Sequence, residues 1–70
     1  MTKQEFLDRY QRYSTQDREA AMREASKANQ EGIEGGEAVC VSLPPLGYCV
    51  MLRSAADLLG LDYTESQAGK

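Results

Sequence analysis

A pair of prolines, Pro44-Pro45, divides an apolar stretch that runs from residue 38 to residue 52. The sequences on either side, AVCVSL and LGYCVML, are rich in β-branched residues and contain an aromatic residue, which favours two strands joined by a turn. Proline cannot adopt the positive φ that a tight two-residue hairpin turn requires. We therefore expect a β-hairpin whose loop is wider than two residues or contains a cis proline.

The register of this hairpin follows from its apolar pattern. With the prolines at the centre of the turn, Val39 lies opposite Val50 and Cys40 lies opposite Cys49. One face then carries most of the large apolar side chains. The other face carries a smaller set, namely Cys40, Ser42, Gly47, Cys49 and Met51. A slip by one residue would mix the two faces, so this separation favours the register.

Cys40 and Cys49 are the only cysteines in the chain. Directly opposed, with Cβ atoms about 4.5–5.5 Å apart, they could form a strained cross-strand disulfide that a reducing cytosol would open. A metal site would need two more ligands, which a chain without histidine must take from carboxylates or a second subunit. A reactive thiol needs a cation or a helix N-terminus nearby. The sequence favours two unreactive side chains, with a redox-dependent disulfide as the alternative.

Helix is predicted before the hairpin. Residues 2–13 begin with Thr2 and Glu5 at capping-box spacing, which satisfies amides of the first turn, and Glu5 and Arg9 form a favourable i,i+4 pair. The apolar residues of this segment share one helical face, namely Phe6, Leu7, Tyr10 and Tyr13. Residues 15–30 are mostly strong helix formers. Their apolar face is thin, namely Ala21, Met22, Ala25 and Ala28.

The boundaries around these helices are predicted from capping residues and glycines. Ser14 and Asp17 repeat the capping spacing, so we favour a turn at Tyr13-Ser14 over one continuous helix. Residues 32–37 are rich in glycine and are expected to be a flexible linker. Their glycine spacing fits no phosphate-binding loop.

A short helix is predicted after the hairpin, because Ser54 and Asp57 give a third capping spacing. The expected fold is therefore α+β, with one or two N-terminal helices, a glycine-rich linker, a β-hairpin and a short C-terminal helix. We expect a single domain, with residues 1–31 helical, 38–62 forming a hairpin-plus-helix core and 64–70 forming a frayed tail.

Several functional classes are disfavoured by composition. The chain carries eleven acidic and eight basic residues, for a net charge of −3, whereas nucleic-acid binding depends on clustered Lys and Arg. It has no histidine, the usual general base near neutral pH. No nucleophile motif is recognisable, and no run approaches the roughly 20 apolar residues of a membrane span. We expect no enzyme activity, no cofactor, no metal, no membrane association and a cytoplasmic location.

Residues 55–67, AADLLGLDYTESQ, resemble the first helix and turn of a helix-turn-helix, with Gly60 and Leu61 in the turn. The resemblance implies a small transcriptional regulator whose second helix enters the DNA groove. That helix would be the short, terminal YTESQAGK, which carries one lysine and one glutamate. A DNA-binding regulator is therefore the second functional hypothesis.

The leading hypothesis is a small non-enzymatic protein that binds and modulates another protein. Tyrosine and arginine are enriched in protein interfaces, and an exposed apolar loop usually contacts a partner. A chain of 70 residues buries a limited core, so we also expect a homodimer. In style, the chain looks like the accessory proteins of phages and mobile elements. The predicted partner-binding residues are Phe6, Arg9, Tyr10, Arg12, Tyr13, Pro44, Pro45 and Leu46.

Overall fold

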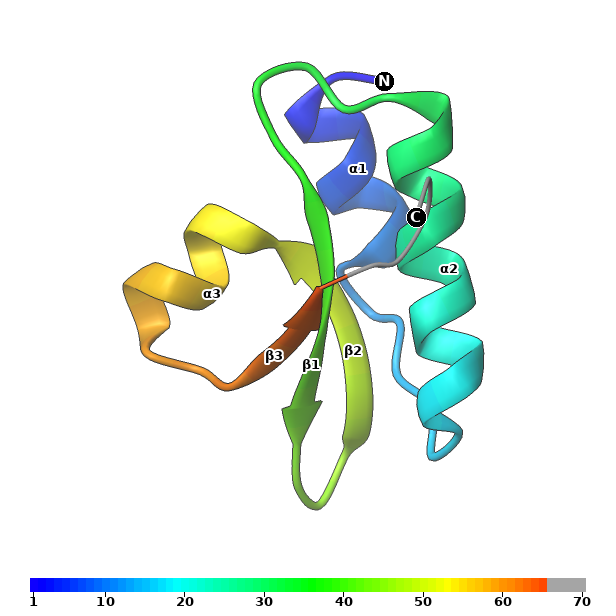
Figure 1. Ribbon diagram of the computed structural model, residues 1–70, viewed down its shortest axis with the longest axis vertical. Coiled ribbons are helices and arrows are strands. Elements are labelled where there is room, and N and C mark those ends of the chain that lie inside the picture. Colours follow the sequence, from blue (N-terminus) through cyan, green and yellow to red (C-terminus); the bar gives the residue numbers. More distant parts are fainter. Residues whose placement is uncertain (66–70) are drawn as a thin grey trace.

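The fold is α+β, as predicted, and a computed structural model describes residues 1–65 of the chain and the side chains of residues 1–63 (Figure 1). Its elements are, in order, α1 (Lys3–Tyr10), α2 (Arg18–Glu31), β1 (Ala38–Leu43), β2 (Gly47–Leu52), α3 (Arg53–Leu59) and β3 (Tyr63–Glu65). The three strands form one sheet in the order β2-β1-β3, and β1 runs antiparallel to both neighbours.

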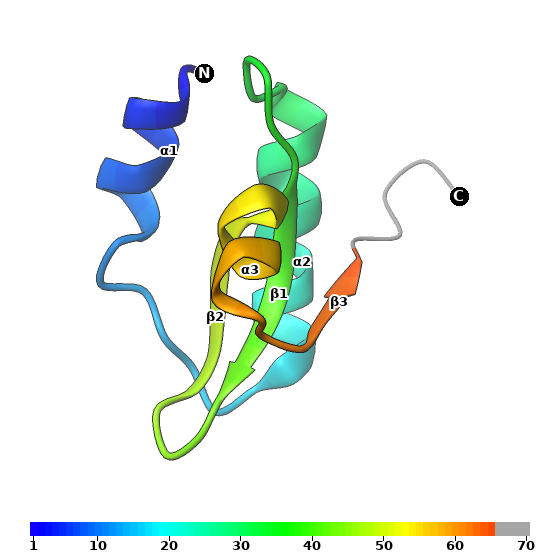
Figure 2. The ribbon, with the colours of Figure 1, turned by 90° about the vertical axis from the view of Figure 1, so that its left-hand side faces the viewer.

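Both faces of the sheet are covered by helix. Figure 1 and Figure 2 show α1 and α2 on one side of the strands and α3 on the other. The buried cluster on the first side consists of Phe6, Tyr10, Ala21, Ala25, Ala28, Ala38, Cys40, Val50 and Leu52. The cluster on the second side consists of Val39, Val41 and Ala56, with Cys49, Met51, Leu61 and Tyr63 partly buried around it.

The predicted alanine face of α2 is the surface that meets the sheet. Ala21, Ala25 and Ala28 are all fully buried, and Met22 packs partly buried beside them. Small side chains allow a helix to approach its neighbour closely, which places polar groups of α2 within reach of the strand. Asn29 uses this proximity: its Nδ2 donates to the Ala38 carbonyl at 3.0 Å and its Oδ1 accepts from the Ala38 amide at 2.7 Å.

The capping box predicted for the first helix is confirmed. Thr2 Oγ1 accepts from the Glu5 amide at 3.1 Å, and Glu5 Oε1 accepts from the Thr2 amide at 2.8 Å. These bonds, first of all the one to the Thr2 backbone, lower the pKa of Glu5. Because the Glu5 carboxylate is occupied here, the expected Glu5–Arg9 pair does not form, and Arg9 instead binds Glu31 of α2 at 3.0 Å.

The N-terminal half contains two helices, but the second begins later than the capping spacing of Ser14 predicts. Asp17 is the N-cap, with its Oδ1 accepting from the Glu19 amide at 3.0 Å. The segment before it is held extended because Thr15 pairs with Tyr48, with N···O distances of 2.9 and 2.7 Å. A residue in an edge pairing cannot also lie in a helix.

The predicted strand register is wrong by one residue. Cys40 lies opposite Val50, Val41 opposite Cys49 and Leu43 opposite Gly47. The loop is therefore wider than two residues, and it contains a cis Pro44-Pro45 bond, so both features anticipated for the turn are present. Alternation failed as a guide because both faces of β1 are covered. A strand buried on both sides is continuously apolar and does not specify its own register.

Helix α3 begins directly after β2, at Arg53, and Leu52 at its N-cap makes no side-chain cap bond. The predicted Ser54 cap is therefore wrong. Gly60 ends the helix in the left-handed conformation at φ 69°, and the Leu61 amide donates to the Ala56 carbonyl at 3.0 Å, as in a Schellman motif.

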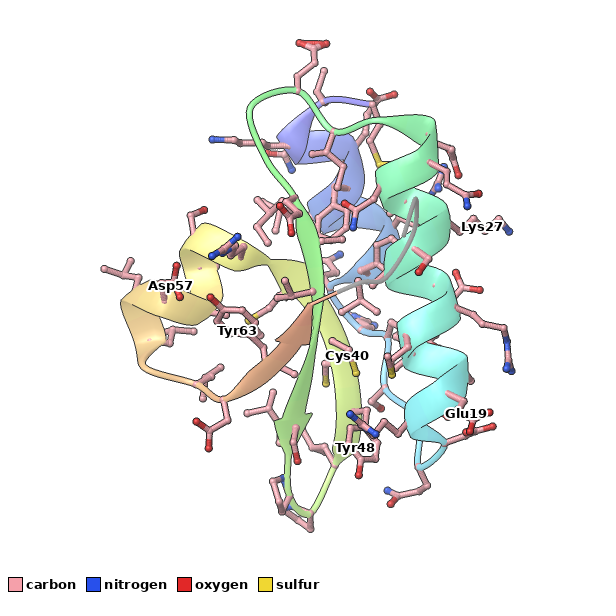
Figure 3. The ribbon with its side chains drawn as sticks, in the orientation of Figure 1. Glu19, Lys27, Cys40, Tyr48, Asp57 and Tyr63 are labelled. Carbon is pink, nitrogen blue, oxygen red and sulfur yellow. The ribbon has the colours of Figure 1, made fainter. Side chains whose placement is uncertain are left out.

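The residues after this turn form β3, which the sequence analysis did not anticipate. Val41 pairs with Tyr63 and Val39 with Glu65, so the recognition helix expected from the helix-turn-helix resemblance is replaced by strand over the described residues. The Tyr63 hydroxyl donates to Asp57 Oδ1 at 2.8 Å and ties β3 to α3 (Figure 3). The expected frayed tail began at residue 64; residues 64 and 65 lie in β3, and 66–70 lie outside the described residues.

Candidate functional site

An apolar groove of about 470 Å³ lies along β2, bordered by α1 and α3. Because β2 is an edge strand, the groove lies where the sheet is open rather than on either of its faces. Figure 2 shows α1 and the segment after it standing beside β2. We call this feature the edge groove. Its lining residues are Phe6, Leu7, Tyr10, Gln11, Arg12, Tyr13, Ser14, Leu43, Leu46, Cys49, Val50, Met51, Ala55 and Leu59.

Exposed leucines surround the edge groove. Among the described residues, four large apolar side chains are exposed, and three of them line the groove: Leu7 at 44%, Leu46 at 61% and Leu59 at 65% exposed. They come from three different elements, namely α1, the hairpin loop and α3. The fourth, Leu58 at 87%, does not line it. The fold therefore gathers three of its four exposed large apolar side chains, counted over the described residues, around a single surface feature.

The predicted aromatic stripe forms one wall of this groove. Phe6 is fully buried and Tyr10 is 5% exposed, so both serve the core while touching the groove. The ring centroids of Phe6 and Tyr10 are 4.9 Å apart, and those of Tyr10 and Tyr13 are 5.7 Å apart. Burial raises the pKa of Tyr10, whose hydroxyl donates to Glu24 Oε1 at 3.1 Å. The stripe is thus a rigid wall more than an exposed contact surface.

The two predicted arginines are placed differently. Arg9 is exposed and paired with Glu31, and it does not line the groove. Arg12 does line it, and none of the described residues forms an ion pair or hydrogen bond with it. Among the described residues, Arg12 is also the only charged one in the groove lining. The groove is therefore apolar with a single cationic group.

The hairpin loop contributes one of its three predicted residues. Pro44 and Pro45 are exposed and do not line the groove, whereas Leu46 does. The loop is anchored by Gln16, whose Nε2 donates to the Leu46 carbonyl at 3.0 Å. This bond fixes the position of Leu46 relative to the segment that joins α1 to α2.

The groove residues contributed by β2 and α3 were not predicted from the sequence. Val50 and Met51 were assigned from the wrong register, and nothing in the sequence distinguished Leu59 from the other leucines of its helix. Leu7 was placed on the buried face of its helix, although it directly follows Phe6, and neighbouring helical residues point about 100° apart. That offset was the signal that could have identified Leu7 as exposed.

The cysteines lie on opposite faces of the sheet and are both free, so the predicted alternative of a disulfide between them is wrong. Cys49 lines the edge groove, whereas Cys40 lines a smaller pocket of about 230 Å³ beside Arg18 and Tyr48. Cys40 and Tyr48 project from the same face of the β1–β2 pair (Figure 3). Burial raises the pKa of each thiol, and for Cys40 the nearby Arg18 acts in the opposite direction. Both thiols are poor nucleophiles as a result.

Within residues 1–65, no group of carboxylates and cysteines is arranged to hold a metal ion. In the same part of the chain, no helix has the length and apolar character needed to cross a membrane. Comparison of the chain with protein-family models, with curated proteins and with solved structures gave no significant match. The geometry of the edge groove is therefore the basis for a functional proposal.

Proposed function

We propose that this chain is a small non-enzymatic interaction module that binds another protein through the edge groove and thereby modulates it. The observation that carries the proposal is the convergence of Leu7, Leu46 and Leu59 on one groove. Each comes from a different element, so their proximity is a property of the fold and not of one amphipathic segment.

The energetics of these side chains support a binding role. Completely burying a leucine contributes about 1.5–3 kcal/mol relative to leaving it exposed, and these three contribute only part of that to folding. Contiguous apolar patches on a soluble chain typically mark interaction sites. The wall formed by Phe6, Tyr10 and Tyr13 is already ordered, so less conformational entropy is lost there on binding.

Adjacent leucines on α3 provide a matched test. Leu59→Asp places a charge in the edge groove, whereas Leu58→Asp places the same charge on a more exposed neighbour outside it. The tagged chain and both variants are used to capture proteins from a lysate of the source cells under reducing conditions. We expect a stoichiometric partner that is retained by Leu58→Asp and lost with Leu59→Asp.

Circular dichroism of both variants provides the control, since each must keep the helix content of the parent chain. Equal capture by Leu58→Asp and Leu59→Asp would show that the groove is not the binding surface. The homodimer expected from composition stays a prediction, which light scattering of the parent chain tests. The cytoplasmic location and the phage or mobile-element origin also stay predictions.

A further inference from the structure

We propose that the edge groove takes an extended segment of the partner protein, which adds to β2 as a further antiparallel strand opposite Val50. This inference rests on the proposed function, because it specifies the form in which the partner enters the groove. It is argued from the backbone N–H and C=O groups of β2 that face the groove, in addition to the apolar side chains around them.

The backbone of Val50 faces away from β1. In an antiparallel pair, successive residues alternate between bonding the partner strand and facing away from it. Tyr48 faces away, since its N–H and C=O bond to Thr15 at 2.7 and 2.9 Å. Val50 lies two residues further along the same strand and therefore faces the same free edge.

Thr15 shows that this edge accepts an antiparallel partner. It forms an isolated bridge with Tyr48, after which the preceding residues leave the edge and turn toward α1, with the Tyr13 amide bonded to the Tyr10 carbonyl at 3.0 Å. Had the chain continued as a strand, Tyr13 would face Val50. Instead, none of the described residues forms a strand on that side of Val50, and Val50 lines the edge groove.

The chain satisfies comparable outward-facing groups elsewhere in the sheet. On the other side of β1, Cys40 pairs with Thr64 of β3, and both backbone groups of Ala38 bond to the Asn29 side chain. No described residue bonds the outward groups of Val50. Since buried backbone groups are nearly always paired and Val50 is only 4% exposed, a segment in the groove would supply the missing partner.

A second copy of this chain fits the edge less well than a short segment does. Symmetric pairing centred on Val50 would place Tyr48 of each copy opposite Leu52 of the other. The Tyr48 backbone is already bonded to Thr15, and Leu52 is the N-cap of α3, whose carbonyl accepts the first helical bond. Only the Val50 pair would remain, so the geometry favours a segment that needs few backbone bonds.

The lining of the groove specifies the chemistry of that segment. An added strand would have α1, with Leu7, on one side and α3, with Leu59, on the other. Because strand side chains alternate between the two faces, both sets would contact apolar residues, as in strands buried on both sides. The segment should therefore carry a short run of consecutive apolar residues. A carboxylate near one end would pair with Arg12.

Selection from a library of short random peptides, displayed and exposed to the whole chain, tests this chemistry. We expect enriched sequences with consecutive β-branched residues and one Asp or Glu, and we expect the Leu59→Asp variant, but not Leu58→Asp, to lose them. For an enriched peptide, Arg12→Gln should weaken binding about two- to fivefold. Lys27→Gln, which removes the same charge from an exposed position of α2 outside the groove lining (Figure 3), should not.

Backbone N-methylation of the enriched peptide tests strand addition itself. Removing the one peptide N–H that faces Val50 should weaken binding about tenfold or more, because it leaves a buried acceptor unpaired, while methylation of its two neighbours should have little effect. Calorimetry provides the affinities, and the amide resonance of Val50 should shift on binding.

Three results would overturn strand addition. Equal affinity of all methylated peptides would overturn it, and so would enriched peptides whose apolar residues recur at helical spacing. In both cases peptide binding to the groove could still depend on Leu59. Failure to enrich any peptide that depends on Leu59 would overturn it as well. Partner capture with the two leucine variants decides the proposed function separately from either result.

Discussion

The two faces of the sheet are covered to different degrees. Toward α1 and α2, the buried cluster includes a fully buried Phe6 and the fully buried alanines of α2. Toward α3, the fully buried set is smaller, and Leu58 and Leu59 remain 87% and 65% exposed. Because stabilisation scales with the apolar area removed from water, the first face carries more of the folding free energy. Among the described residues, the exposed large apolar side chains belong to α3, α1 and the hairpin loop.

Truncating a fully buried side chain on each face should give the largest effects. Phe6→Ala should cost about 3–5 kcal/mol. Proteins retain only about 0.05–0.15 kcal/mol of stability per residue, so this cost is a large share of the stability of a chain of 70 residues. Val41→Ala, equally buried but toward α3, should cost about 1.5–2.5 kcal/mol. Urea unfolding followed by circular dichroism measures both. Because Phe6→Ala removes more apolar area than Val41→Ala, a cost of Phe6→Ala no larger than that of Val41→Ala would contradict the complete burial of Phe6.

Gly47→Ala should give the next largest effect. Gly47 begins β2, the edge strand beside the groove. Gly47 has φ 103°, and an added Cβ would collide with the Thr15 carbonyl oxygen. We expect a cost of about 2–3 kcal/mol, together with loss of the Thr15–Tyr48 bridge. Gly32→Ala is the matched control, since Gly32 has φ 91° but nothing within 4 Å of an added Cβ, and its cost in urea unfolding should be smaller. A smaller cost at Gly47 than at Gly32 would mean that Thr15 does not pack against this edge.

Asn29→Ala tests whether polar contacts also favour the α1–α2 face. The substitution removes both side-chain bonds to Ala38 and should cost about 1–3 kcal/mol, because it leaves backbone groups without partners. Hydrogen exchange should show faster exchange of the Ala38 amide, while Gln30→Ala, at an exposed neighbour, should leave it unchanged. Unchanged exchange in Asn29→Ala would exclude this bridge.

Thr2→Ala should give the smallest of these effects, about 1 kcal/mol, through loss of the helix cap. The pKa of Glu5 lies below its ordinary value of 4.5 in the folded chain. Glu5 therefore contributes stability above its unfolded pKa, and this contribution is lost as the pH falls through the lowered value. Thr2→Ala keeps the backbone bond that is the main cause of the lowered pKa, so Glu5→Gln, which removes the carboxylate, is the variant whose stability should depend less on pH below 4.5, as measured by thermal unfolding at a series of pH values. Thr2→Ser keeps the cap and should cost less than Thr2→Ala, and an unchanged pH profile in Glu5→Gln would contradict the lowered pKa of Glu5.

Local signals predicted much of the fold, because they depend on neighbours in the sequence. The capping box at Thr2 and the turn at Gly60 are contacts within a few residues, and the alanine face of α2 follows from the spacing of residues along one helix. The register and β3 depend instead on contacts between distant segments. Val39 and Val41 are buried on the side of α3 and β3. Because β1 is covered on both faces, its apolar residues do not show which face of the strand meets the main core.

The candidate site was only partly predictable for the same reason. Tyr13, Arg12 and Leu46 were selected by residue type, and the structure places all three in the edge groove. No sequence pattern links Leu7, Leu46 and Leu59, which meet only because α1 and α3 flank the same strand edge. Predicting the groove required knowing that β2 lies at the edge of the sheet.

The register of β1 and β2 determines the two-sided core, the separation of the cysteines and the outward direction of the Val50 backbone. Nuclear Overhauser effects between Hα protons test it directly, since Cα atoms approach to about 4.5 Å in non-hydrogen-bonded pairs. We expect strong Hα–Hα cross peaks between Cys40 and Val50 and between Ser42 and Tyr48. Cross peaks between Cys40 and Cys49 instead would shift the strands by one residue, turn the Val50 side chain to the other face and contradict the edge groove as described.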